Sequence, residues 1–233
     1  METTTPRNLR VLTYLTGGLF LVSLYMVFFY APREVVMGEV QRVFYYHVSS
    51  LWVGMLAFLV TFVAGIIYLR TGAAKWDQVA VSAVEIGLVF TTMGTLGGAI
   101  WARPIWNTWW TWDPRLTTTT IMWLLYVAYL MLRQGIDDVG RRRRFAAVYG
   151  VVAFVSVPLT FFAIRIWRTI HPVVIGGGDP SVEGNFSMTP RMLQTFLFSL
   201  FTFTVLYVTL MWYRLRLERM SEHVAALRAK LAS

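Results

Sequence analysis

Apolar residues along this chain gather into six long stretches, each separated from the next by a short segment that carries most of the polar residues. They run over residues 11–30, 48–69, 79–100, 118–132, 145–164 and 192–212. A helix needs about 20 apolar residues to cross the hydrocarbon core of a bilayer. The pattern therefore predicts an all-α integral membrane protein with six transmembrane helices, in a single domain that covers residues 1–233.

The first and fourth stretches depart from the common pattern. The first follows Arg7 and Arg10, as the apolar run of a signal peptide does, but it exceeds the usual ~7–15 residues and no small-x-small cleavage site follows it. We expect it to be a retained helix. The fourth is short unless its threonines are counted, whose hydroxyls can bond to their own helix backbone in lipid.

Composition supports a membrane protein and excludes several other classes. Hydrophobic residues make up 57% of the chain and charged residues 14%, which is too apolar for a soluble domain of this size. The formal charge of +9 does not indicate nucleic-acid binding, because the basic residues flank the apolar stretches, where topology and lipid head groups account for them. The absence of cysteine excludes disulfides, thiolate metal sites and a C-x-x-C-H motif for covalent haem attachment.

The distribution of Lys and Arg predicts the orientation of the six spans. With the N-terminus inside, the inner segments hold 14 of these residues and the outer loops hold 7. The positive-inside rule then places both termini in the cytoplasm, together with a tail at residues 213–233. We interpret the four arginines at 141–144 as a topology anchor. The outer loops cover residues 31–47, 101–117 and 165–191.

Two of the outer loops contain a histidine close to a predicted span. In the first, Val36, Val40, Val43, Phe44 and His47 form one stripe of an amphipathic helix, which predicts a short interfacial helix before the second span. In the third, His171 precedes Pro172 and would share a face with Trp167 if the fifth span continued that far. Thr189 and Pro190 are typical of an N-cap and first turn, here for the last span.

Tryptophans are concentrated in the middle outer loop, where five of the ten fall within residues 101–112. An aromatic belt scatters its rings over both interfaces, so this concentration favours a dedicated surface for a large planar ligand. Asp113 follows, in an Asp-Pro pair. Its carboxylate could cap the next helix or orient a ligand-binding group, and the sequence leaves both roles open.

Two histidines, a tryptophan-rich surface and nearby arginines on one side of a membrane fit a haem site. Imidazoles can bind iron from opposite faces and arginines can pair with propionates, for which the candidates are Arg42, Arg103, Arg115 and Arg168. A lone interfacial histidine is more often structural, so the residues alone leave the roles of His47 and His171 open. His223 lies in the charged tail and is expected to be solvated.

The third stretch contains two further features. Glu85 is an ionisable group inside a span, for which we favour a structural or subunit-docking role over haem passage. Gly94, Gly97, Gly98 and Ala99 form a small-residue patch suited to close helix packing, and this patch could dock a partner subunit.

A family resemblance rests on the segment GAIWARPIWNTWWTWDPRLT, which closely resembles the tryptophan-rich WWD signature of haem-handling membrane proteins of cytochrome c maturation. The segments FYYHVSS and SAVEIGLVFTT and the dipeptide HP extend the likeness over most of the chain. The chain length and the six-span plan are similar to those of the haem exporter protein C (CcmC) family.

The resemblance implies a function in c-type cytochrome biogenesis in the bacterial inner membrane. Members of this family present haem b, as cargo, on the outer face to a periplasmic haem chaperone (CcmE), and work with ABC transporter subunits (CcmA and CcmB) and a small membrane subunit (CcmD). By matching position, His47 and His171 would be the axial ligands. The haem and chaperone surface would consist of Trp106, Trp109, Trp110, Trp112 and Asp113, with Arg115 as a further haem-binding residue.

The sequence offers no acid–base dyad in the outer loops, so we expect a transfer factor without classical catalytic residues. One alternative is a cytochrome c synthase or haem lyase with the same tryptophan signature, although those relatives resemble longer chains with histidines inside the membrane. Another is a non-haem integral subunit or permease whose tryptophans only anchor it. That alternative predicts a purified protein without haem absorbance.

Overall fold

The computed structural model describes residues 5–35, 37–167, 169–171 and 188–232. Within this part of the chain, six helical segments are long and apolar enough to cross a membrane, which confirms the predicted fold class. They are Arg7–Tyr30, Gln41–Thr71, Ala74–Trp106, Pro114–Gln134, Val139–Ile166 and Pro190–Ser221. Each is longer than its apolar stretch, because the helices continue into the polar flanks.

The helices are α1 (Arg7–Tyr25), η1 (Met26–Tyr30), α2 (Gln41–Thr71), α3 (Ala74–Trp106), α4 (Pro114–Gln134), α5 (Val139–Ala153), α6 (Ser156–Ile166) and α7 (Pro190–Ala232). Here η1 is a π-helical turn that ends the first span, and α5 and α6 together form the fifth. The break between α5 and α6 has a local cause, since Pro158 has no N–H to donate to the carbonyl of Phe154 and its ring crowds that carbonyl.

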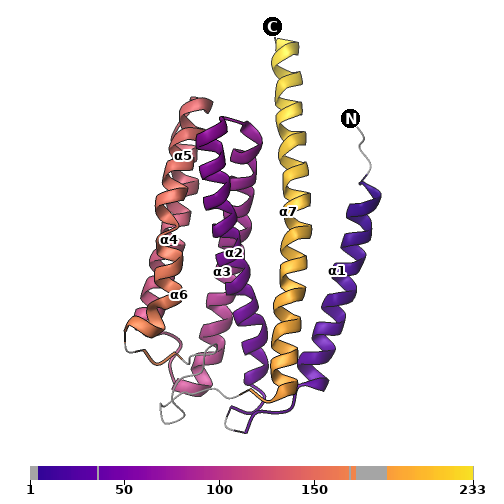
Figure 1. Ribbon diagram of the computed structural model, residues 1–233, viewed down its shortest axis with the longest axis vertical. Coiled ribbons are helices and arrows are strands. Elements are labelled where there is room, and N and C mark those ends of the chain that lie inside the picture. Colours follow the sequence, from indigo (N-terminus) through magenta and orange to yellow (C-terminus); the bar gives the residue numbers. More distant parts are fainter. Residues whose placement is uncertain (1–4, 36, 168, 172–187, 233) are drawn as a thin grey trace.

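An antiparallel pair, α2 and α3, forms the centre of the molecule (Figure 1). On one side of this pair lie α4, α5 and α6, and on the other lie α7 and then α1, which packs against α7. The N- and C-termini lie at the same end, which we call the terminal end, and the segments 31–40 and 107–113 lie at the opposite end, which we call the loop end. Which end faces the cytoplasm stays a prediction.

Glycines allow α2 and α3 to approach each other closely. A Cβ on Gly94 would meet the side chain of Leu51 at 2.7 Å, and one on Gly87 would meet the ring of Phe58 at the same distance. Gly98 faces the ring of His47. The small-residue patch of the third span therefore packs against α2 of the same chain, and the expectation that it docks a partner subunit is not supported.

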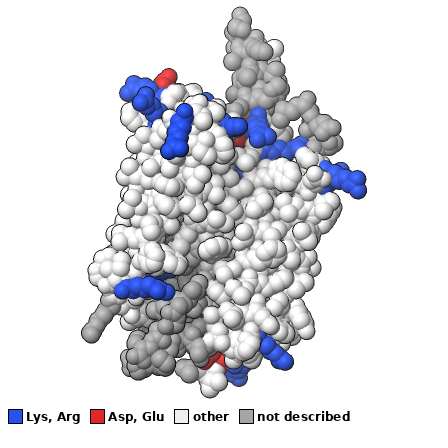
Figure 2. All heavy atoms as spheres, in the orientation of Figure 1, with Lys and Arg blue, Asp and Glu red and all other residues white. Residues whose placement is uncertain are grey.

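Ion pairs join helices towards the terminal end. Asp77, at the start of α3, is 5% exposed and binds Arg133 of α4 through two contacts, the longer of which is 3.0 Å. Arg143 of α5 lies 3.4 Å from the same carboxylate, so one arginine of the 141–144 run has a structural contact. Most Lys and Arg on the face shown in Figure 2 gather at this end, above a wide uncharged band.

Glu85 also has a structural partner. Arg214 of α7 holds its carboxylate through Nε and Nη2, at 2.5 and 3.0 Å, and its Nη1 binds Glu218 at 2.6 Å. Glu85 therefore has a structural contact within the chain, which joins α3 to α7.

The predicted interfacial helix before the second span is not found as a separate element. Residues 31–35 and 37–40 form turns, with an isolated bridge between Glu34 and Gly38, and α2 starts at Gln41 and continues unbroken into the membrane. Phe44 is 5% exposed because its ring packs 5.5 Å from that of Phe196 on α7. The apolar stripe thus faces a neighbouring helix where we expected the membrane surface; Val36 lies outside the described residues.

Candidate functional site

A cavity of about 250 Å³ lies at the loop end, between α2, α3, α4, α6 and α7. It brings together six of the eight candidate site residues: His47, Trp106, Trp109, Trp110, Arg115 and His171. These residues come from three separate segments of the chain, at residues 47, 106–115 and 171. The two remaining candidates, Trp112 and Asp113, lie beside the cavity and do not line it.

His47 is held by the backbone of α3. Its Nδ1 lies 2.6 Å from the carbonyl oxygen of Gly94. A carbonyl oxygen only accepts, so Nδ1 carries the proton and Nε2 keeps its lone pair. The ring rests on Gly98, where a Cβ would lie 2.6 Å from its Cε1. Gly98 is therefore required for this ring position.

His171 lies beside a carboxylate. Its Nδ1 lies 3.5 Å from Oδ2 of Asp113, and its ring packs edge-on against Trp106 with centroids 5.3 Å apart. Thr169 completes the arrangement, because its hydroxyl donates to the same Oδ2 and accepts the backbone N–H of His171 at 3.1 Å. Trp167 is not on a shared helical face, since α6 ends at Ile166.

The structure confirms the capping role of Asp113, and its role in orienting a ligand-binding group stays a prediction. It is the N-cap of α4, where Oδ1 accepts the N–H of Leu116 at 3.0 Å and Pro114 occupies the first helical position. Its other oxygen faces His171 and Thr169. Burial raises the pKa of this carboxyl, but the nearby imidazole of His171 and the hydrogen bonds from Thr169 and Leu116 outweigh burial and lower the pKa to about 2.

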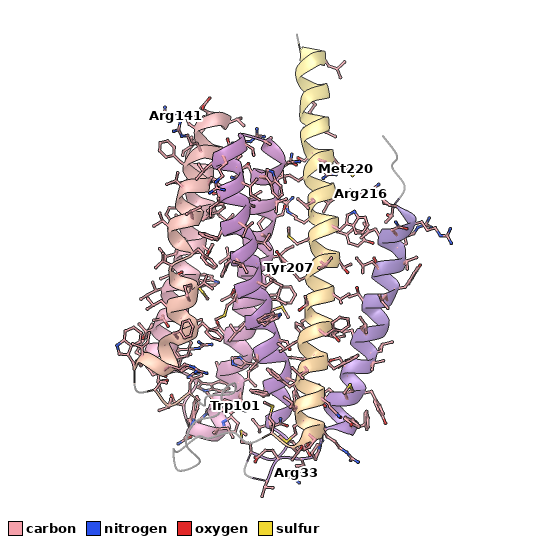
Figure 3. All side chains as sticks on the ribbon, in the orientation of Figure 1. Arg33, Trp101, Arg141, Tyr207, Arg216 and Met220 are labelled. Carbon is pink, nitrogen blue, oxygen red and sulfur yellow. The ribbon has the colours of Figure 1, made fainter. Side chains whose placement is uncertain are left out.

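The tryptophans divide into a packed group and an exposed group. Trp101, which is 7% exposed, packs perpendicular to Trp106 at 5.0 Å between centroids. Trp109 and Trp112 are 58% and 71% exposed, and Trp112 packs perpendicular to Trp110. Figure 3 places Trp101 near the loop end. One side of this cluster therefore faces the cavity and the other faces outwards.

Several buried polar groups beside the cavity have no hydrogen-bond partner. They are Nε1 of Trp101, Nε1 of Trp110, Oγ1 of Thr111 and Nδ1 of His171. A buried donor without a partner costs about 1–3 kcal/mol, so such groups are rarely left unpaired without a reason. Their position in the cavity wall is typical of a binding site for a ligand with polar substituents.

The structure separates the four arginine candidates. Arg115 lines the cavity, and its Nη1 donates to the carbonyl oxygens of Thr160 and, at 3.2 Å, Phe161. Arg42 is engaged elsewhere, with Glu39 and the carbonyl of Val27. Arg103 donates to Asn107, and Arg168 lies outside the described residues, as do residues 172–187 of the third loop.

The salt bridge with Arg42 lowers the pKa of Glu39, which lies in the turns before α2. Arg42 thus joins these turns to Val27 of η1. Its role is structural.

Sequence reasoning missed several cavity residues. Leu51, Trp52 and Met55 of α2 form an apolar wall one to two turns beyond His47, and Trp52 donates to Oγ1 of Thr204 on α7 at 3.0 Å. Once α2 is known to include His47, its 3.6-residue period places Leu51 and Met55 on the same face. Thr169 carried no signal, because an isolated threonine in a loop is unremarkable.

Fold and site together define a polytopic membrane protein with a tryptophan-walled cavity at one end, and two histidines line this cavity. The chain belongs to the CcmC family, described as Heme exporter protein C, whose model matches residues 1–230. It is 31% identical over 210 residues to Heme exporter protein C of Bradyrhizobium diazoefficiens, covering 87% of this chain and 76% of the relative. It is also 31% identical to Heme exporter protein C of Escherichia coli K12, covering 81% and 74%.

A more distant relative comes from a plant. The "Putative cytochrome c biosynthesis ccmC-like mitochondrial protein" of Marchantia polymorpha is 27% identical over 150 residues, covering 64% of this chain and 63% of the relative. The predicted family is therefore confirmed. The roles of the individual site residues stay predictions.

Proposed function

We propose that this protein binds haem b as cargo in the cavity at its loop end, with His47 and His171 as axial ligands, and presents it for c-type cytochrome biogenesis. The names of its relatives, which refer to haem export and to cytochrome c biosynthesis, support this class of function. The observation that carries the proposal is the state of the two imidazoles. Both rings enter one cavity, and both have Nδ1 facing an acceptor.

Metal-binding histidines almost always donate the second ring N–H to a carbonyl or a carboxylate. His47 has a carbonyl, from Gly94, and His171 has a carboxylate, from Asp113. For His47 the proton on Nδ1 leaves Nε2 as the metal-binding atom, and the approach of Nδ1 to Asp113 favours the same arrangement for His171. Two histidines with only structural roles would not need to line the same cavity with Nδ1 of each facing an acceptor.

The rest of the cavity wall also suits haem. Trp106, Trp109 and Trp110 offer apolar ring surface to a porphyrin, and Leu51 and Met55 extend that surface into the membrane. Arg115 is the described arginine candidate placed to pair with a propionate. The unpaired N–H groups of the tryptophan cluster would gain acceptors from the same substituents.

The two histidines differ in a way that suits cargo. His47 lies inside a packed helix pair, against Gly98, whereas His171 follows the end of α6 in a short segment held by Thr169 and Asp113. A ligand from a loop can leave iron with less disturbance of the fold than one from a helix. His171 is therefore the ligand that an acceptor would replace first.

The acceptor in this proposal is a periplasmic haem chaperone (CcmE), and the exposed Trp109 and Trp112 provide its docking surface. The protein works in the bacterial cytoplasmic membrane beside ABC transporter subunits (CcmA and CcmB) and a small membrane subunit (CcmD). It acts as a transfer factor, and the bond between haem and chaperone forms on the chaperone. Among the described residues, the cavity contains no pair of carboxylates that could act as general acid and base.

A transfer experiment tests the proposal. Haem-loaded protein in nanodiscs, with the small membrane subunit, is mixed with the apo-chaperone, and haem retained by the chaperone after denaturation is measured. We expect transfer that Trp112→Ala slows while haem binding by this protein is unchanged, because Trp112 lies outside the cavity wall. Failure of the loaded protein to deliver haem would contradict the presentation role.

A further inference from the structure

Apolar side chains form a stripe along the last part of α7, which continues past the ends of the neighbouring helices. Leu217, Met220, Val224 and Leu231 are 58%, 37%, 46% and 89% exposed, and we call them the tail stripe. Their spacings of three, four and seven residues are those of the apolar seam in a two-stranded coiled coil. From Leu217 onwards, none of the described side chains of α7 is buried.

Lipid cannot cover the far part of this stripe. At 1.5 Å per residue from Pro190, Val224 lies about 50 Å and Leu231 about 60 Å along the helix, whereas the hydrocarbon core is about 30 Å thick. Figure 1 shows α7 running straight past the ends of α2 to α5 as a single helix. Figure 3 places Arg216 and Met220 on α7 level with the last turns of the neighbouring helices, before the part that runs past them. The stripe therefore enters the aqueous phase without turning onto the membrane surface.

The tail stripe continues an existing helix interface. Three hydroxyl pairs join α1 to α7: Ser23 with Ser199 at 3.3 Å, Thr16 with Thr209 at 2.8 Å and Thr13 with Tyr213 at 2.9 Å. At about 100° per residue, all four stripe residues fall within about 40° of Tyr213 around the helix. The side of α7 that binds α1 thus extends beyond the start of α1 at Arg7.

Charge indicates what the extension binds. Residues 213–233 hold five Lys and Arg and two Glu, a net charge of +3, and Glu218 is already bound by Arg214. Arg228 borders the stripe on one side, and Arg216 and Arg219 lie on the other. A second copy of this chain, paired in parallel, would bring like charges together, whereas acidic residues beside the seam of a partner would form ion pairs.

We infer that the tail stripe is the docking surface for an amphipathic helix of a different protein, whose apolar seam is flanked by acidic residues. The partner helix packs against the same side of α7 that α1 packs against within the membrane. This inference is independent of the haem site, because it concerns the opposite end of the molecule.

A peptide-binding experiment on the full chain in nanodiscs tests the inference. The chain has no cysteine, so Ser221→Cys gives a single exposed site, beside the stripe, for an environment-sensitive fluorophore. The probe is a coiled-coil peptide with Leu at its seam and Glu on both flanks, and the control peptide has Lys on the flanks. We expect the acidic peptide to bind and the basic peptide not to bind.

Matched variants distinguish a loss of peptide docking from a general effect of serine substitution on the protein. In Leu217→Ser/Val224→Ser, binding of the acidic peptide should weaken by at least about tenfold, as truncation of interface anchors does. Val139→Ser removes a valine of similar exposure, 45%, at the same end of the molecule and should have no effect.

Three results would overturn the inference. The first is equal binding, or no binding, of the two peptides. The second is a fluorophore signal that changes with anionic lipid alone, which would assign the stripe to the membrane surface. The third is self-association of the chain that the serine variant abolishes, which would assign it to a second copy.

Discussion

Substitution of Gly98 by alanine should weaken haem binding through the position of His47. The new Cβ would lie 2.6 Å from Cε1 and 3.0 Å from Nδ1 of the imidazole. Carbon atoms in contact prefer about 3.5–4.0 Å, so the ring must move by about 1 Å. That movement breaks the 2.6 Å hydrogen bond from Nδ1 to the carbonyl of Gly94.

The expected magnitude follows from the contacts that are lost. The hydrogen bond contributes about 1 kcal/mol net, and overpacking costs about 1–3 kcal/mol where the neighbour cannot yield. If about 1.4 kcal/mol of this cost is lost from the free energy of haem binding, the Kd for haem rises about tenfold.

Gly97→Ala is the matched control. Its Cβ would meet Cβ and Cα of His47 at 3.6 and 3.7 Å, which are ordinary contacts. Both substitutions gain about 1 kcal/mol of helix propensity, so the difference between them isolates the contact with the ring. The assay is a haem titration followed by visible absorption, with thermal unfolding of the haem-free proteins as a check on folding. Equal haem affinity in the two variants would refute the argument that Gly98 positions His47.

Three further predictions concern the two ion-paired regions. Asp113→Asn keeps an N-cap for α4 but cannot hold His171 as a carboxylate does, so the haem spectrum should shift while the thermal midpoint changes little; an unchanged spectrum would exclude this role. Asp113→Ala should shift the spectrum and also destabilise the protein by about 1 kcal/mol, measured by chemical denaturation. Arg214→Leu should lower the midpoint of thermal unfolding because Glu85 loses its partner, and Glu85→Gln should restore part of the loss in that background; an additive double variant would contradict the pairing.

Local sequence signals predicted the elements well where a residue pattern has one dominant structural effect. Six apolar stretches gave six spans, and the Asp-Pro pair gave a capped helix start at Asp113. The threonines of α4 do bond to their own backbone, as Thr119 shows by donating to the carbonyl of Arg115 at 2.8 Å. Thr189 likewise accepts the N–H of Met192 at 3.4 Å at the start of the last span.

Features that depend on tertiary partners were not predictable in the same way. The amphipathic stripe before the second span suited a membrane surface as well as a neighbouring helix, and only the ring of Phe196 beside Phe44 decides between them. Long arginine side chains can reach many groups, so the sequence could not show that Arg42 binds Val27 while Arg115 faces the cavity.

The candidate site was predicted in its residue types and only partly in its geometry. The sequence identified both histidines and the tryptophans, since their concentration is unusual. It did not identify the support of each imidazole. That support depends on Gly98 for His47 and on Thr169 for His171, and both are small, common residues whose roles exist only after helix packing brings distant segments together.

The central claim is that His47 and His171 bind haem iron from opposite faces, and the visible absorption spectrum of the purified, haem-supplied protein tests it most directly. Oxidised and reduced spectra are compared for the wild type, His47→Ala, His171→Ala and the double variant. We expect a low-spin spectrum typical of two imidazole ligands, changed in each single variant and absent in the double variant. A colourless wild-type protein, or a spectrum that neither substitution changes, would contradict the claim.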